Sequence, residues 1–211
     1  KVLLEQVELV IKSGECITIS GHSGSGKSLL FSILCGVTMA SRGQICIDGV
    51  SMSNMSREQM AEFRRQLGAV FQRPALVSNL SLMENLLLPL NLHYPEMTQE
   101  QKHKRVLELT DEFELTGSLP ARTHTLSTGQ AALASLARAL VNQPQCLLWD
   151  SPLANVDPNW DQLVTSKLAQ VKKSGATLIL FTNRQELINK LADRRFELVA
   201  ARLRGLDAKS E

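Results

Sequence analysis

The sequence Gly21-His22-Ser23-Gly24-Ser25-Gly26-Lys27-Ser28 decides the fold of this chain. It lies between an apolar run, Cys16–Ser20, and a segment of helical character that begins near Lys27. In such a loop the backbone N–H groups and the helix N-terminus point at phosphate oxygens, and glycines allow the close approach. A Gly/Ser turn without a ligand would not need the Lys-Ser pair in this strand-helix context. The pattern therefore predicts that Gly21 to Leu29 hold a nucleotide phosphate, with Lys27 on the phosphates and Ser28 on Mg²⁺.

The composition limits the classes of protein to which the chain can belong. With 211 residues and 44% hydrophobic content, it is long enough to bury the core of a single domain. Its 23 Lys and Arg nearly balance 21 Asp and Glu, so the sequence carries no broad positive surface and we expect no nucleic-acid partner. The longest apolar runs fall far short of the roughly 20 residues that span a bilayer. Any membrane role is therefore expected to come through a partner protein.

The four cysteines do not have the spacing of a metal site, and each has apolar neighbours. We expect them to be small buried hydrophobic residues in a reducing cytosol. They are Cys16, Cys35, Cys46 and Cys146.

Strand-like runs alternate with helical stretches along the chain, which predicts an α/β fold around a mostly parallel sheet. The nucleotide is then expected at the carboxyl edge of that sheet. The predicted strands are Cys16–Ser20, Gln44–Ile47, Gly68–Phe71, Gln145–Trp149 and Ala176–Phe181.

A helical insert is predicted for residues 73–125. Ser81 and Thr98 each begin a sequence with capping-box spacing, so each is expected to open a helix. Three prolines are expected to divide the insert into pieces. We therefore predict one domain, 1–211, with an ATP-binding core at 1–72 and 126–201, the insert between them, and a solvated polar tail at 202–211. The dividing prolines are Pro89, Pro95 and Pro120.

Further motifs follow the phosphate loop in a characteristic order. They are an isolated Gln72, the run Leu126-Ser127-Thr128-Gly129-Gln130 before an Ala-rich helix, the apolar strand that ends at Asp150, and Asn155-Val156-Asp157. Over essentially the whole chain this order resembles the ATP-binding subunits of ABC transporters. The resemblance implies the P-loop NTPase fold, with a small N-terminal antiparallel β part and an α-helical subdomain.

The resemblance also implies roles for these residues. Lys27 and the loop amides would hold the phosphates of ATP, while Ser28, Gln72 and Asp150 would hold or sense Mg²⁺. Two subunits of this family pair head to tail, so the second motif of one subunit would contact ATP bound by the other. The residues implied in that contact in trans are Ser127, Thr128, Gly129, Gln130 and Asp157.

Two positions depart from the family pattern at the catalytic step. Family members usually carry a Glu after the Mg²⁺-binding Asp, and here that position is Ser151, whose hydroxyl is not basic near neutral pH. The usual switch His is replaced by Asn183, which cannot carry positive charge. We predict impaired hydrolysis with Lys27, Gln72, Asp150, Ser151 and Asn183 as the catalytic set. The alternative is that water organised by Gln72 sustains slow turnover.

The resemblance implies an integral membrane permease as partner and a homodimer or heterodimer with a second ABC ATP-binding subunit, at the cytoplasmic face of the cell membrane. Residues 52–92 resemble the corresponding stretch of ATP-binding subunits that serve lipid or lipoprotein systems. Two groups fit: the lipoprotein-release, macrolide-export and cell-division group, and the phospholipid-trafficking group of the mammalian-cell-entry type. Residues 73–95 are the predicted permease surface. The alternative function is a non-hydrolysing, ATP-gated scaffold that pairs with a catalytically complete partner.

Overall fold

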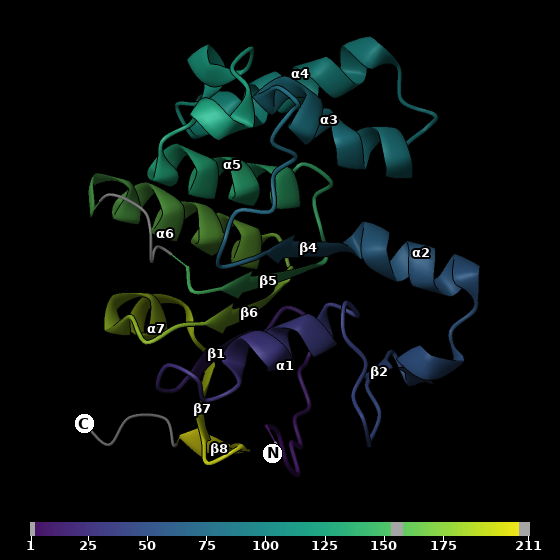
Figure 1. Ribbon diagram of the computed structural model, residues 1–211, viewed down its shortest axis with the longest axis vertical. Coiled ribbons are helices and arrows are strands. Elements are labelled where there is room, and N and C mark those ends of the chain that lie inside the picture. Colours follow the sequence, from purple (N-terminus) through teal and green to yellow (C-terminus); the bar gives the residue numbers. More distant parts are fainter. Residues whose placement is uncertain (1–2, 153–157, 207–211) are drawn as a thin grey trace.

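The computed structural model describes residues 3–152 and 158–206, and Figure 1 shows their arrangement. One mixed sheet runs through this part of the chain in the order β4-β5-β6-β1-β7-β8, and a separate two-stranded sheet joins β2 and β3. The strands are β1 Cys16–Ser20, β2 Cys46–Ile47, β3 Val50–Ser51, β4 Leu67–Val70, β5 Cys146–Asp150, β6 Thr177–Phe181, β7 Arg194–Val199 and β8 Arg202–Leu206.

Helices cover both faces and one edge of the main sheet. In Figure 1, α3, α4 and α5 lie beyond the β4 edge, and α2 projects to one side. Short 3-10 turns occupy Met52–Asn54, Thr116–Ser118 and Thr123–Thr125. The α-helices are α1 Lys27–Leu34, α2 Arg57–Gln66, α3 Leu82–His93, α4 Gln99–Glu112, α5 Thr128–Leu140, α6 Pro158–Lys173 and α7 Gln185–Leu191.

The core is two-sided because successive side chains of a strand point to opposite faces. In β5, Leu147 and Trp149 pack into the cluster that contains α3 to α6, whereas Leu148 packs into the cluster around α1. Phe31 of α1 fills that second cluster and makes edge-to-face contacts with Phe71 and Phe181 at centroid distances of 5.0 and 5.8 Å. Both faces of the central strands are therefore buried, as a parallel sheet requires.

The strand order brings distant loops to one edge of the sheet. β1 lies between β6 and β7 and pairs with both in parallel, while β5 lies beside β6. The carboxyl ends of β1, β5 and β6 therefore meet, and each is followed by a residue predicted for the site. The α/β fold with a mostly parallel sheet, a small antiparallel sheet and a helical part is confirmed.

Both predicted capping boxes are present. The Ser81 hydroxyl accepts from the N–H of Glu84 at the start of α3, and the Thr98 hydroxyl accepts from the N–H of Gln101 at the start of α4. The prediction that Pro89 divides the insert is wrong, because Pro89 lies inside α3. Proline removes one helix hydrogen bond. Buried Leu86 and Leu90 on either side of it hold the helix against the core.

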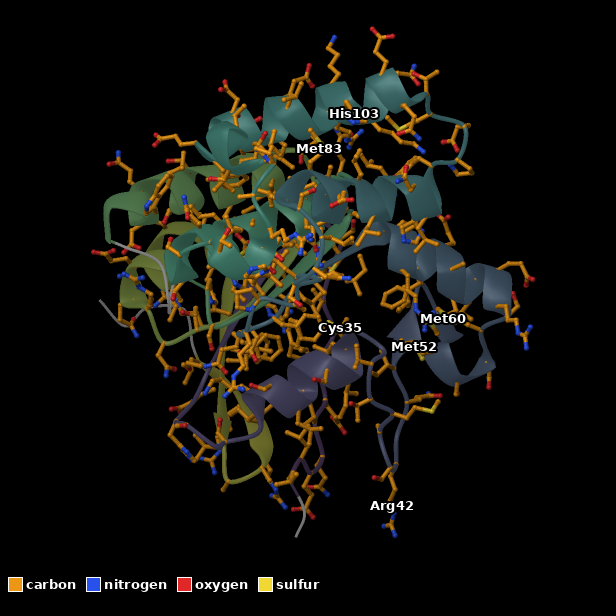
Figure 2. The ribbon with its side chains drawn as sticks, turned by 45° about the horizontal axis from the view of Figure 1, so that its top comes forward. Cys35, Arg42, Met52, Met60, Met83 and His103 are labelled. Atoms are coloured by element: carbon orange, nitrogen blue, oxygen red, sulfur yellow. The ribbon has the colours of Figure 1, made fainter. Side chains whose placement is uncertain are left out.

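Other boundaries and environments also differ from the sequence predictions. Residues Arg202–Leu206 of the predicted solvated tail are mostly exposed, but they form β8 and pair antiparallel with β7. Cys46 is exposed, since the small sheet that carries it stands apart from the main sheet. In Figure 2, Cys35 lies in the interior at the end of α1, whereas Arg42 projects from the tip of the following loop. The predicted strand Cys16–Ser20 is confirmed, the other four predicted strands shift by one or two residues, and β3, β7 and β8 were not predicted.

Within the described ranges, none of the helices combines the length and the apolar character needed to cross a bilayer.

Candidate functional site

The phosphate loop connects β1 to α1 and has the backbone shape that its glycines allow. Gly24 and Gly26 have φ of 76° and 105°, in the region that other residues rarely adopt. Gly24 is exposed, and a Cβ on it would meet no heavy atom within 4 Å, so the space beside it is open. Gly26 serves as the N-cap of α1 without a side-chain cap, and the first N–H groups of a helix have no partner within the helix. The loop therefore offers backbone donors and a helix N-terminus to an anion.

Lys27 folds back over the loop. Its Nζ donates to the carbonyl oxygens of Gly21 at 2.6 Å and His22 at 2.9 Å. Burial lowers the pKa of Lys27, and the carboxylate of Asp150 partly offsets that shift. The amine lies where a phosphate oxygen would compete with two carbonyl oxygens for its hydrogens.

Asp150 is the last residue of β5 and is 3% exposed. The hydroxyl of Ser151 donates to Asp150 Oδ1 at 3.1 Å, and the Ser151 N–H donates to the Phe181 carbonyl at 2.9 Å. Ser151 has φ of 58°, a left-handed conformation that is uncommon for serine and is found at functional sites. The position predicted to lack the catalytic Glu therefore touches the predicted Mg²⁺ ligand.

Asn183 follows β6 and reaches the first glycine of the loop. Its Oδ1 accepts from the N–H of Gly21 at 2.9 Å, and its Nδ2 donates to the carbonyl of Gly21 at 3.0 Å. The structure thus brings two predicted site residues together across 162 positions of sequence.

The second motif begins α5 on the helical side of the molecule. Ser127 is the N-cap: its hydroxyl accepts from the Gln130 N–H at 3.2 Å, and Gln130 Oε1 accepts from the Ser127 N–H at 3.0 Å. Gln130 also donates to Ser118 at 3.4 Å. Ser127 and Thr128 are exposed, and Gly129 is half-buried. Among the described residues, no hydrogen bond joins this motif to the phosphate loop of the same chain.

Two other predicted residues have simpler environments. Gln72 is exposed and lies two residues beyond β4, on the same edge of the sheet as Asp150. His22 is exposed, as expected, with Nδ1 2.7 Å from the Ser23 carbonyl oxygen. Asp157 lies outside the described residues.

Comparison with known proteins identifies the family. The family profile described as "ABC transporter" matches residues 4–154, well over half of the chain. This chain belongs to the ABC transporter family. It is 34% identical over 192 residues to a methionine import ATP-binding protein of Bartonella henselae, covering 90% of this chain and 55% of that protein. It is 35% identical over 187 residues to an uncharacterized ABC transporter ATP-binding protein of Methanocaldococcus jannaschii, covering 88% and 83%.

Solved structures agree with this membership. A dimeric, post-hydrolysis structure of the ATP-binding cassette MJ0796 bound to ADP and Pi has a TM-score of 0.90 and 29% identity. The similarity covers 98% of this chain and 92% of that chain. The chain spans only 55% of the length of the methionine import relative.

The residues present fit the ligands that an ABC protein uses. The space beside Gly24 is open, so nothing in the loop blocks the approach of a phosphate there. Ser28 is exposed in the first turn of α1, and the Asp150 carboxylate ends β5, which packs against α1. A hydroxyl and a carboxylate would supply hard oxygen ligands of the kind that Mg²⁺ prefers. Buried Ser25 Oγ has no hydrogen-bond partner within the described chain. This unpaired hydroxyl is a polar group that a ligand or water at the loop would satisfy.

Sequence reasoning missed the contacts of two polar side chains, each of which fixes a loop that follows a strand of the main sheet. Arg184, beside Asn183, forms an ion pair with Asp161 of α6 and so fixes the loop after β6 to that helix. Asn85 of α3 is fully buried and bonds both the N–H and the carbonyl of Val77, at 2.8 and 3.0 Å. Their spacing in sequence gave no signal, because each contact depends on tertiary packing.

Proposed function

We propose that this chain is the ATP-binding subunit of a membrane transporter, and that it couples MgATP binding to a permease while hydrolysing ATP poorly. The observation that carries this proposal is the phosphate loop with Lys27 poised over it, beside a serine and an amide where the family usually has Glu and His. In this proposal Lys27 and the loop amides hold the phosphates, and Ser28 and Asp150, with Gln72 nearby, hold or sense Mg²⁺. The bound ion supplies charge neutralisation on the phosphates.

The second motif supports a head-to-tail dimer. Ser127 and Thr128 face solvent, and no hydrogen bond of the described chain joins them to their own phosphate loop. In a dimer, Ser127, Thr128, Gly129, Gln130 and Asp157 of one subunit complete the site of the other. We propose a second ABC ATP-binding subunit, of the same or a different chain, as the dimer partner.

The permease and the transported molecule form the second part of the proposal. The exposed stretch after β4, with Gln72 at its start, is the surface we assign to the permease, at the cytoplasmic face of the membrane. Methionine import is the activity in the name of one relative above. That name lends no support to the lipid or lipoprotein substrate predicted from residues 52–92, which stays a prediction.

The proposed weakness in hydrolysis has a direct chemical basis. Ser151 is not basic, and its hydroxyl hydrogen is already donated to Asp150. Loss of a general base typically lowers a rate by about 10²–10⁴-fold. Asn183 is uncharged, and both ends of its amide are engaged with Gly21. These same observations favour the second candidate function, an ATP-gated scaffold that leaves hydrolysis to a complete partner subunit.

The test measures ATP binding and steady-state phosphate release on the subunit alone and with its co-purifying membrane partner. We expect the wild-type subunit to bind MgATP, to lose binding in Lys27→Ala, and to release phosphate slowly. Stoichiometric retention of unhydrolysed ATP would favour the scaffold. Turnover at an ordinary transporter rate that Lys27→Ala abolishes would overturn the claim of impairment, and absence of nucleotide binding would overturn the proposed function.

A further inference from the structure

We infer that Asn183 is a positioning residue that holds the phosphate loop in its binding shape, through the Gly21 peptide, independently of any γ-phosphate. This inference rests on the proposed function, because it concerns how the same loop binds a nucleotide. Its basis is the pair of hydrogen bonds that Asn183 makes to the N–H and the carbonyl of one residue, Gly21, at 2.9 and 3.0 Å.

The register of the sheet explains how the side chain reaches this place. Ile19 of β1 pairs with Phe181 of β6, and the Thr182 N–H donates to the Ile19 carbonyl at 3.0 Å. Gly21 and Asn183 each lie two residues beyond that pair. The backbone hydrogen bonds between β1 and β6 end here. The carboxamide of Asn183 then bonds the N–H and the carbonyl of Gly21, the groups that the next two backbone hydrogen bonds of the pair would use.

Asparagine suits this position for a chemical reason. A carboxamide presents one acceptor and one donor on a short planar group, as a peptide does. An ionised aspartate accepts only, and a glutamine is one methylene longer. The two nitrogens of a histidine ring point away from each other, so they cannot bond the N–H and the carbonyl of one residue together. Asn183, which departs from the family pattern, can therefore make both hydrogen bonds to Gly21, and we call this pair of bonds the clamp.

The clamp is connected to the phosphate-binding lysine. The Gly21 carbonyl accepts from both Asn183 Nδ2 and Lys27 Nζ, the latter at 2.6 Å. When Lys27 turns toward a phosphate, Asn183 still satisfies this carbonyl, so Lys27 leaves without creating an unpaired buried acceptor. No side chain fits at Gly21, because a Cβ there would lie 2.7 Å from the Leu198 carbonyl oxygen and 2.8 Å from Ser25 Oγ.

ADP distinguishes this role from sensing of the γ-phosphate. A residue that touches only the γ-phosphate changes ATP affinity and leaves ADP affinity unaltered. A residue that shapes the loop around the shared phosphates changes both affinities by the same factor. The test therefore titrates ADP and ATP, each with Mg²⁺, into the full chain by calorimetry.

The variants are Asn183→Leu, which removes both bonds at similar size, Asn183→Asp, which keeps only the acceptor, and Gln185→Leu, a matched control two residues along on the exposed start of α7. We expect Asn183→Leu to weaken ADP and ATP binding equally, by about five- to tenfold, since two hydrogen bonds are lost. Hydrogen exchange of the peptide that contains Gly21 is expected to accelerate in nucleotide-free Asn183→Leu and not in Gln185→Leu.

The outcomes separate the two claims. In Asn183→Leu, a loss of ATP affinity alone overturns the positioning role. Unchanged affinity for both nucleotides together with unchanged hydrogen exchange also overturns it. In either case, nucleotide binding by the wild-type chain leaves the proposed function intact. If Asn183→Leu is misfolded by circular dichroism, Asn183→Asp decides, because a loss confined to ATP then overturns the inference and an equal loss of ADP and ATP supports it. A wild-type chain that binds neither nucleotide overturns the proposed function itself.

Discussion

The Ser151 hydroxyl donates to Oδ1 of Asp150 at 3.1 Å, so the residue in place of the usual Glu is a neighbour and hydrogen-bond donor of the predicted Mg²⁺ ligand. The contact occupies one of the several lone-pair sites of the carboxylate. A carboxylate at position 151 would remove that donor and add a base.

Ser151→Glu is therefore expected to raise kcat for ATP hydrolysis by about 10²-fold at saturating MgATP. Ser151→Ala is the matched control, because it removes the hydroxyl without adding a base, and it is expected to leave kcat unchanged. Phosphate release measures both. Equal kcat in Ser151→Glu and wild type would show that another group already positions the attacking water.

The double variant Ser151→Glu/Asn183→His separates turnover from binding. We expect kcat to rise further than in Ser151→Glu, because a histidine can carry positive charge. KM is expected to rise as well, because the clamp on Gly21 is lost. A higher kcat at unchanged KM would contradict the clamp.

Nucleotide binding should depend on pH through Lys27. Burial lowers the pKa of this lysine, and a bound phosphate favours its charged form, so binding takes up protons at alkaline pH. ADP affinity is expected to fall as the pH rises into the alkaline range, and to do so at a lower pH than an ordinary lysine pKa of about 10.4 would cause. Calorimetry in buffers of different ionisation enthalpy measures the proton uptake. Lys27→Met is the control, and proton uptake in that variant would assign the effect to another group.

The thiols should differ sharply in reactivity. Burial raises the pKa of Cys16, Cys35 and Cys146 to about 12, so almost no thiolate forms on them near neutral pH. Cys46 is exposed, and we expect it alone to react quickly with a thiol reagent in the native protein. Cys46→Ser should remove the fast phase, and Cys146→Ser should keep it. A fast phase that survives in Cys46→Ser would mean that a buried thiol opens readily to solvent.

Asn85 is expected to stabilise the stretch between β4 and α3. Asn85→Leu keeps the size of the side chain but removes the acceptor of the Val77 N–H and one of the donors to the Val77 carbonyl, which also accepts from Thr123. We therefore expect a loss of about 1–3 kcal/mol in the free energy of unfolding. Asn79→Leu, at an exposed position of the same stretch, is the control and should change stability little. Denaturant unfolding compares the two, and equal midpoints would refute the role.

The features that sequence predicted well are local. The phosphate loop, the capping boxes at Ser81 and Thr98, and the apolar run that ends at Asp150 each depend on residues within a few positions of one another. Hydrophobic periodicity and capping chemistry act at that range, so the five predicted strands were found with small errors at their ends, whereas β3, β7 and β8 were not predicted.

The remaining features depend on tertiary contacts. Pro89 is tolerated in α3 because buried leucines hold the helix, and the polar residues from Arg202 form a strand because β7 offers an edge. The bond between Asn183 and Gly21 follows from the pairing of β1 with β6, which no short window of sequence reveals. Asn183 was predicted for the site, but its contact with Gly21 could not be predicted from the sequence.

The N-cap hydrogen bond at the start of α5 also determines which interactions remain open to the Ser127 hydroxyl. Ser127 Oγ uses a lone pair to accept from the Gln130 N–H, and within the described chain its hydrogen has no acceptor. The Ser127 hydroxyl therefore has its hydrogen available to donate a hydrogen bond, at the positive end of the helix. Such a group discriminates by charge: it attracts an anion brought by a neighbouring molecule and offers little to a cation.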